Sequence, residues 1–207
     1  MRAPSAKEYN VTTGGYLQRA EELRKLDGLA NLFYAAFELR CALERTMVDF
    51  LVLITQPDPP EQYIKGGQYK PRVVLGIIRK TDPEFERRLH YTRLVMQASG
   101  VTRTNTPFDF DWVCDSHDAL NVYLHHQKDP NLTVLVTEWV AGLEQNVDSI
   151  RAKLLAMWKS NRGYLESTTF AGDQVYELFK TRMHSDEEIV RMLRLSDLPD
   201  SLQSRAL

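Results

Sequence analysis

The sequence predicts an all-α protein, a helical bundle with a small helical C-terminal extension. Apolar residues recur at helical spacing through two long segments, residues 29–54 and 132–161, which is the pattern of amphipathic or buried helices. Proline- and glycine-containing breaks separate these segments from several shorter ones with the same spacing. A chain of 207 residues, of which 43% are hydrophobic, is long enough to bury a core of its own.

The N-terminal part of the chain is expected to contain an irregular arm, one short helix and then the longest helix. Residues 12–15 (TTGG) resemble a helix breaker, and residues 16–26 (YLQRAEELRKL) have the pattern of a short amphipathic helix. Asp27-Gly28 stops that helix. The long apolar segment at 29–54 then spans about seven helical turns. Three prolines in four residues end it, at Pro57, Pro59 and Pro60.

Residues 72–80 (RVVLGIIRK) are compatible with either a strand or a helix. Their β-branched content allows a strand. Pro71 at a first helical position, with Val74 and Ile78 one turn apart, favours a helix. Directly afterwards, Thr81 and Glu84 form a capping-box pattern that predicts a helix extending to about residue 97.

Four further helices are predicted in the second half of the chain, at residues 110–127, 132–161, 173–180 and 185–194. The last of them begins with a second capping-box pattern, Ser185 with Glu188. These elements suggest three regions. They are an N-terminal arm and short helix (1–28), a helical bundle (29–163) and a C-terminal helical extension (164–207).

Charge and composition exclude several classes of protein. With 26 basic and 28 acidic residues the net charge is -2, which argues against nonspecific coating of nucleic acid. The apolar segment at 29–54 carries five charged residues in its centre, so membrane insertion is not expected. The first fifteen residues lack an apolar signal core, and neither Cys41 nor Cys114 lies in a CxxC motif. We therefore expect a cytoplasmic protein with reduced thiols.

The first candidate site is a charged pair within the longest helix. Arg40 and Glu44 are four residues apart and fall among apolar side chains, where unpaired charges are costly. The pair has two interpretations: a clamp that fixes the register of neighbouring helices, or a charged group that lines a cleft. Three other charged residues of this helix are expected on a solvated face, namely Glu38, Arg45 and Asp49.

The second candidate site is a polar stripe on the predicted helix 110–127. Cys114, His117, Asn121 and His125 share one side of this helix at helical spacing. No established ligand spacing such as HExxH is present, so we expect no metal and no cofactor here. His125 has two interpretations, a histidine at a helix end or a general acid–base or phosphate-contacting group.

Three short motifs together resemble a family of uncharacterised bacterial helical proteins that is itself similar to the HEPN superfamily of α-helical bundles. They are AAFELRCALER (35–45), QYKPRVVLGIIRKTDP (68–83) and LNVYLHH (120–126). HEPN ribonucleases carry an arginine and a histidine on one helix and act as dimers that cleave RNA without metal. The resemblance places His125 at the histidine and Asn121 at the polar residue, whereas Leu120 stands at the arginine position. Arg40 from the other helix is then the candidate replacement.

The resemblance implies a cytoplasmic homodimer that acts by binding RNA or a partner protein, in a bacterial defence or toxin-type system. One alternative is a metal-independent ribonuclease in which His125 moves a proton and an arginine stabilises the developing phosphorane-like charge. Another alternative is a structural subunit of a larger assembly. The candidate site residues for all these functions are Arg40, Glu44, Asn121 and His125.

Overall fold

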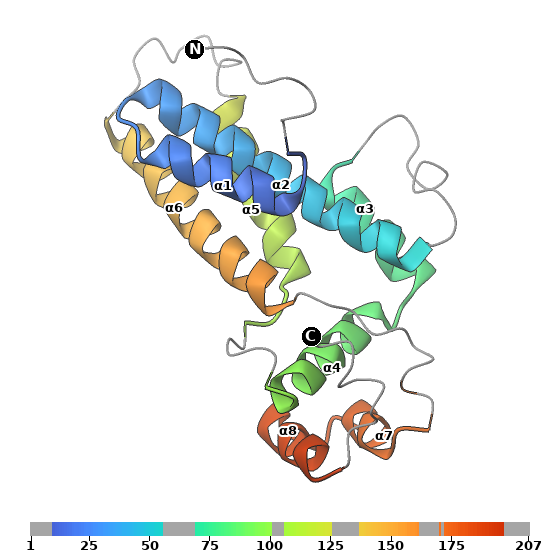
Figure 1. Cartoon of the computed structure of the whole chain (residues 1–207). Coiled ribbons are helices and arrows are strands. Elements are labelled where there is room, and N and C mark those ends of the chain that lie inside the picture. Colours follow the sequence, from blue (N-terminus) through green and yellow to red (C-terminus); the bar gives the residue numbers. More distant parts are fainter. Residues whose placement is uncertain are drawn as a thin grey trace. The chain divides into compact units, whose positions relative to one another are not determined.

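Helices are the regular secondary structure of this protein wherever the chain is described. The computed structural model describes residues 10–55, 69–100, 106–125, 137–161, 170 and 172–196. Within these ranges it contains eight helices and no strand, which confirms the predicted all-α class (Figure 1). The contacts divide the chain into two compact units. Unit 1 consists of residues 1–82 and 109–155, and unit 2 of residues 83–108 and 156–207.

Unit 1 is organised around its longest helix, α2 (Leu29–Thr55). The shorter helix α1 (Thr13–Arg24) lies beside it (Figure 1) and runs antiparallel, with the Thr13 and Thr46 hydroxyls 3.1 Å apart and the α1 C-terminus leading directly into α2. The connection turns at Gly28, whose φ of 108° is accessible chiefly to glycine. The predicted stop at Asp27-Gly28 therefore matches the structure.

The predicted breaker at residues 12–15 lies instead inside a helix. Helix α1 begins at Thr13 because the Thr12 hydroxyl accepts a hydrogen bond from the Gly15 N–H at 3.1 Å and caps the first turn. Glycine is required at position 15 for space, since a Cβ there would lie 2.5 Å from the Asn10 carbonyl oxygen. Gly15 thus permits close approach of the preceding chain, and the two glycines do not interrupt the helix.

Three further helices complete unit 1, and each packs on α2 or on a neighbour of α2. Helix α3 (Pro71–Thr81) confirms the helical interpretation of this segment, with Pro71 in its first turn. Helices α3 and α5 (Phe110–Leu124) both contact α2. Helix α6 (Thr137–Ser160) joins α1 through the Arg24–Asp148 ion pair at 2.8 Å. The boundary between the two units falls within α6, after Leu155.

The predicted capping box at Thr81 is not formed. Helix α3 continues through Thr81, so this residue has helical geometry and cannot act as an N-cap. Helix α4 (Phe85–Ala98) begins instead after Glu84, whose side chain makes no capping hydrogen bond. The same pattern at Ser185 does form both reciprocal hydrogen bonds and confirms the second predicted capping box.

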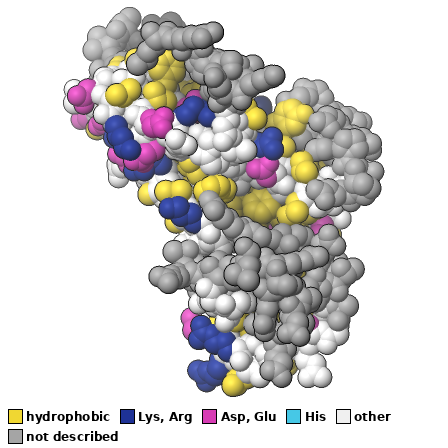
Figure 2. Space-filling model, in the orientation of Figure 1, with side chains coloured by type: hydrophobic (Ala, Val, Ile, Leu, Met, Phe, Trp, Pro, Cys, Tyr) yellow, Lys and Arg dark blue, Asp and Glu magenta, His cyan; other side chains and the backbone are white. Residues whose placement is uncertain are grey.

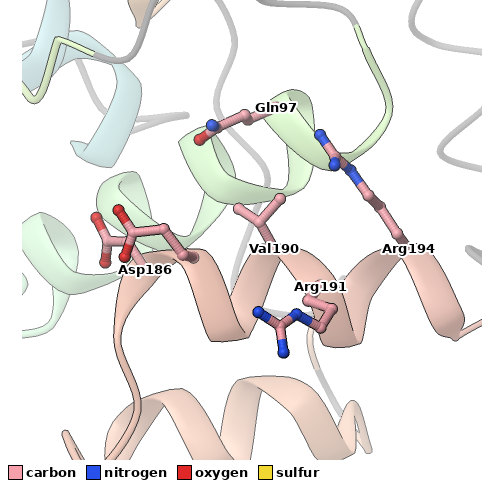
Figure 3. Close-up of a pocket in the computed structure, with 6 residues that line it drawn as sticks. Gln97, Asp186, Val190, Arg191 and Arg194 are labelled. Atoms are coloured by element: carbon pink, nitrogen blue, oxygen red, sulfur yellow. The ribbon is translucent and has the colours of Figure 1, made fainter.

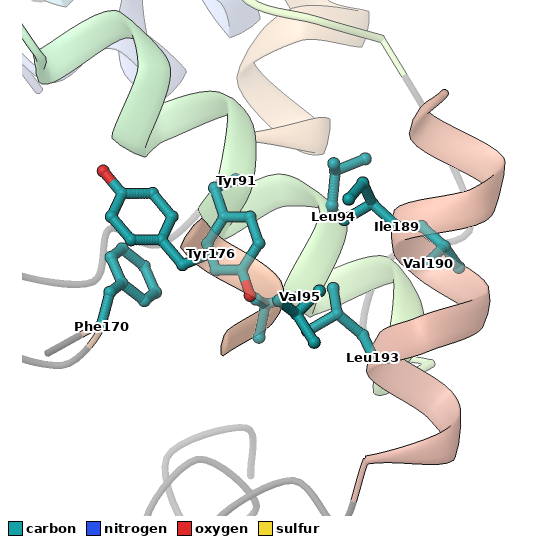
Figure 4. Close-up of a cluster of buried hydrophobic side chains, with 9 residues drawn as sticks. Tyr91, Leu94, Val95, Phe170, Tyr176, Ile189, Val190 and Leu193 are labelled. Atoms are coloured by element: carbon teal, nitrogen blue, oxygen red, sulfur yellow. The ribbon is translucent and has the colours of Figure 1, made fainter. Parts of the chain in front are cut away.

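Unit 2 is built from α4, α7 (Gln174–Lys180) and α8 (Asp186–Leu195) around a core of its own. Figure 4 shows the two parts of this core, an aromatic group around Tyr91 and an aliphatic group between α4 and α8. The Tyr91 hydroxyl donates to Asp173 at 2.7 Å, and Asp173 also caps α7 by accepting from two backbone N–H groups. The buried core residues are Tyr91, Leu94, Val95, Phe170, Val175, Tyr176, Ile189, Val190 and Leu193.

The two units have different boundaries from the three predicted regions. Helix α1, predicted as part of a separate region at 1–28, packs on α2 and belongs to unit 1. Helix α4, predicted within the bundle at 29–163, shares its core with the C-terminal helices. The described segments contain no helix of the length and apolarity that crossing a membrane requires.

Candidate functional site

The candidate site lies in unit 1, where α2 and α5 pack side by side in opposite directions. Phe50 of α2 and Phe110 of α5 have ring centroids 5.2 Å apart and fix the register of the two helices. Glu44 and His117 each lie one and a half to two turns from this contact along their own helix, and there the two side chains face each other. The packing of the two aromatic rings therefore determines which polar side chains meet.

Glu44 is the centre of a short polar network. Its Oε1 atom accepts from Arg40 Nε at 3.0 Å, within α2, and lies 2.9 Å from His117 Nε2 of α5. The His117 side chain is only 3% exposed, whereas Arg40 and Glu44 each remain about a quarter exposed. The predicted Arg40–Glu44 pair is present, and its carboxylate also binds across to the neighbouring helix.

The hydrogen bonds on both sides of the imidazole indicate the protonation pattern of His117. The Asn121 amide nitrogen lies 3.1 Å from His117 Nδ1, so the amide can donate to that atom. Nε2 then carries the proton and donates to Glu44, which is the assignment that satisfies both contacts. Asn121 Oδ1 is buried and has no hydrogen-bond partner among the described residues.

A further carboxylate, Asp118, lies beside this network on the side of α3. Asp118 Oδ1 lies 3.4 Å from His117 Nδ1, and the other Asp118 oxygen accepts from Arg72 of α3 at 2.9 Å. Arg72 also binds Asp115 at 2.9 Å. These outer groups are largely exposed, so their ion pairs stabilise the protein little compared with the inner contact at His117.

The environment keeps the Glu44 carboxylate ionised. Burial alone raises the pKa of Glu44, but the hydrogen bond from His117 and the charge and hydrogen bond of Arg40 outweigh it. The pKa of Glu44 consequently lies below its ordinary value. A similar balance lowers the pKa of Asp118, where the hydrogen bond and charge of Arg72 outweigh burial.

The structure places His125 away from this network. His125 is the C-cap of α5, where its backbone N–H donates to the Asn121 carbonyl and its side chain is exposed. It follows His117 by eight residues, which is about 12 Å along a helix. Arg40, Glu44 and Asn121 are thus brought together through His117, and His125 takes no part in these hydrogen bonds.

His117 is the member of the site that was not among the predicted catalytic residues. Its position on the same helix side as Asn121 and His125 was visible in the sequence. Which histidine meets Glu44 depends on the pairing of Phe50 with Phe110, a contact between residues 60 positions apart in the chain. Helical spacing alone carries no information about that pairing.

Glu38 was expected on a solvated face, and this expectation is wrong. Its side chain is buried against α1, where Arg19 Nε donates to Glu38 Oε2 at 2.9 Å. The other two residues of that predicted face, Arg45 and Asp49, do form a half-exposed ion pair at 2.7 Å. Helix α1 therefore covers part of α2 that a single-helix pattern assigns to solvent.

The arrangement has the properties of a clamp between helices. Both ring nitrogens of His117 have partners, and its ring is closed off from solvent. The described segments also contain no group of three or more His, Cys, Asp or Glu side chains close enough to hold a metal ion. The contacts support the register-fixing interpretation of Arg40 and Glu44.

Comparison of the chain with known protein families, with curated proteins and with solved structures found no match.

Proposed function

We propose that this chain acts by binding a protein partner through α2 of unit 1, and that the partner is a second copy of the chain. The supporting observation is an exposed aromatic pair on the longest helix. Tyr34 is 62% exposed and Phe37 is 47% exposed, and their spacing of three puts them on one side of α2. Large exposed aromatic side chains are enriched in protein–protein interfaces.

The clamp described above supports this role by holding α2 rigidly. Arg40 and Glu44 lie one and two turns beyond Phe37, and their bond to His117 ties this stretch of α2 to α5. A surface that is already ordered loses less conformational entropy when it binds. The network thus contributes to binding by keeping the aromatic pair on a fixed helix.

The charges of unit 1 favour a protein partner over RNA. On the face shown in Figure 2, basic and acidic side chains lie intermixed over unit 1. Most arginines of this unit are matched by carboxylates, which leaves little uncompensated positive charge for phosphate groups. These pairs are Arg19–Glu38, Arg24–Asp148, Arg40–Glu44, Arg45–Asp49, Arg72–Asp118, Arg79–Asp111 and Arg151–Glu21.

Two considerations favour a second copy as the partner. The resemblance to HEPN-like bundles implies dimers, and an isologous interface needs only a patch that is complementary to itself. The ion pairs beside the aromatic residues are neutral as pairs, so two copies of this face approach without like-charge repulsion. A cytoplasmic place in a bacterial defence or toxin-type system belongs to the same proposal and rests on the resemblance alone.

The test is the mass of the protein in solution. Light scattering after gel filtration is expected to give twice the 23.9 kDa of one chain at concentrations up to about 100 µM. A double variant, Tyr34→Ser with Phe37→Ser, is expected to elute as a monomer. Val122→Ser is the matched control, because Val122 is 67% exposed on α5 and lies outside the aromatic pair. A monomeric wild-type protein, or a dimeric double variant, contradicts the proposal.

The metal-independent ribonuclease is a second candidate because the His125 side chain is exposed at the end of α5. An imidazole in that position is accessible to an RNA strand. Purified protein is incubated with single-stranded RNA in EDTA, alongside His125→Gln. Cleavage that His125→Gln abolishes without changing the circular dichroism spectrum supports this candidate and contradicts a binding role alone.

A further inference from the structure

We infer that unit 2 carries a binding site for a small organic anion, in a pocket between α4 and α8. The pocket has a volume of about 310 Å³. This volume is near the lower end of the range for small-molecule sites, which is roughly 300–1,000 Å³. Figure 3 shows its lining, with Gln97 on α4 and the other labelled side chains on α8. The lining residues are Gln97, Asp186, Glu187, Val190, Arg191 and Arg194.

Two arginines give the pocket its positive charge. Arg191 and Arg194 are three residues apart, so both guanidinium groups come from neighbouring turns of α8. Both side chains are exposed, and within the described part of the chain neither takes part in an ion pair. Basic side chains gather over α8 in Figure 2 as well. This contrasts with unit 1, where most arginines are matched by carboxylates.

The carboxylate at the other end of the pocket is already neutralised. Asp186 lies 2.9 Å from His90 Nε2 and 3.2 Å from Arg93 Nη2. The Arg93 side chain is only 2% exposed, and its Nε and Nη1 atoms have no hydrogen-bond partner within the described residues. The charge of the buried Arg93 guanidinium compensates that of Asp186, so the positive charge of the pocket comes from Arg191 and Arg194. Glu187, the other lining carboxylate, has no ion-pair partner among the residues that the structure describes, so the lining keeps a net positive charge.

The remaining lining residues indicate which chemical groups are attached to the anion. Val190 offers an apolar contact between the charged ends, and the Gln97 side chain ends in an amide that can hydrogen-bond. The Arg194 side chain points towards Gln97 in Figure 3, whereas Arg191 points to the other side of α8, so each guanidinium is available separately. A single guanidinium suits phosphate and carboxylate oxygens, because it binds either group in a planar, two-pronged manner. The expected ligand is a phosphate or carboxylate attached to a small apolar group.

The experiment titrates the full-length protein with three probes that share one ring. Phenyl phosphate and benzoate carry the two possible anions, and phenol carries neither. Isothermal titration calorimetry is expected to show saturable binding of at least one anion below about 10 mM and no saturation with phenol. The stronger of the two anions identifies whether the site selects phosphate or carboxylate. Phenol binding as tightly as the anions, or no saturation with either anion, overturns the proposal.

Variants of the arginines locate the binding. Arg191→Gln and Arg194→Gln are each expected to weaken anion binding by about tenfold, the loss expected for a charge-assisted hydrogen bond. Arg182→Gln is the control, since Arg182 is an exposed arginine of unit 2 outside the pocket lining. Equal affinities in all variants contradict the site. The proposed site is also contradicted if neither small anion binds while a short single-stranded RNA does, in a way that depends on both arginines.

Discussion

Replacing Glu44 by glutamine tests whether the contact between α2 and α5 stabilises unit 1. The amide keeps the size of the side chain and can still accept a hydrogen bond from His117. It loses the charge that strengthens the bonds from Arg40 and His117, which measure 3.0 and 2.9 Å. Hydrogen bonds to charged groups contribute about 1.5–3 kcal/mol and neutral ones about 0.5–1.5 kcal/mol. Because a quarter of the Glu44 side chain is exposed, we expect Glu44→Gln to cost about 1.5 kcal/mol at pH 7.

The same substitution predicts a pH dependence with a definite sign. The folded-state pKa of Glu44 lies below its ordinary value of 4.5, so the unfolded chain binds more protons in this region. The stabilisation from Glu44 is therefore complete above pH 4.5 and is lost as the pH falls through the folded-state pKa. The difference between the wild-type protein and Glu44→Gln is expected to shrink over the same interval.

The assay follows urea unfolding of unit 1 by tryptophan fluorescence. Trp158→Phe is made first, because the two remaining tryptophans, Trp112 and Trp139, then both lie in unit 1. Glu22→Gln is the matched control, since Glu22 is exposed on α1 and the substitution is chemically identical. The control is expected to change the free energy of unfolding by less than about 0.5 kcal/mol. A Glu44→Gln loss no greater than the control, or one that stays constant below pH 4.5, refutes the clamp.

Four further predictions concern local features. Gly15→Ala is expected to destabilise the protein by about 1–3 kcal/mol in urea unfolding, because its Cβ meets the Asn10 carbonyl oxygen at 2.5 Å. Gly76→Ala in α3 is expected instead to stabilise the protein by about 0.5–1 kcal/mol, because outside the neighbouring helical backbone no atom lies within 4 Å of the added Cβ. Equal effects of the two substitutions contradict this prediction. Burial raises the pKa of the Cys41 and Cys114 thiols to about 11. Alkylation by iodoacetamide at pH 8 is therefore expected to be at least about tenfold slower in the folded protein than in the protein unfolded in urea, and equal rates contradict this prediction. Ser185→Ala removes the α8 capping box and is expected to cost about 1 kcal/mol in urea unfolding, whereas no loss means that the cap does not stabilise unit 2.

The helices could be predicted from the sequence because their signals are local. Pro71 in the first turn and buried residues at Val74 and Ile78 distinguish α3 from a strand. The capping pattern at Ser185 predicts the start of α8 for the same reason. The pattern at Thr81 fails because α3 continues through that residue, which therefore has helical geometry and cannot cap α4.

The candidate site could be predicted only in part. Arg40 and Glu44 belong to one helix, so their spacing predicts the ion pair directly. The choice between His117 and His125 as the partner depends on the register of two helices, and the ring contact of Phe50 with Phe110 sets that register. No pattern within either helix carries this information.

The division into units depends on contacts between distant segments. Helix α4 precedes α7 by 75 residues, yet Tyr91 of α4 packs on Tyr176 of α7 with ring centroids 4.9 Å apart. The linear order of helices suggested an extension after residue 163. A truncation at that point would expose the apolar face of α4, so it tests the core of unit 2 together with any docking role of the C-terminal helices.

Hydroxyl-radical footprinting of Tyr34 and Phe37 tests the proposed binding role most directly. The protein is oxidised in dilute and in concentrated solution, with Met183, which is 81% exposed in unit 2, as the internal reference. If two copies meet through α2, oxidation of both aromatic residues falls at high concentration while that of Met183 stays constant. Equal oxidation of Tyr34 and Phe37 at both concentrations contradicts the proposal.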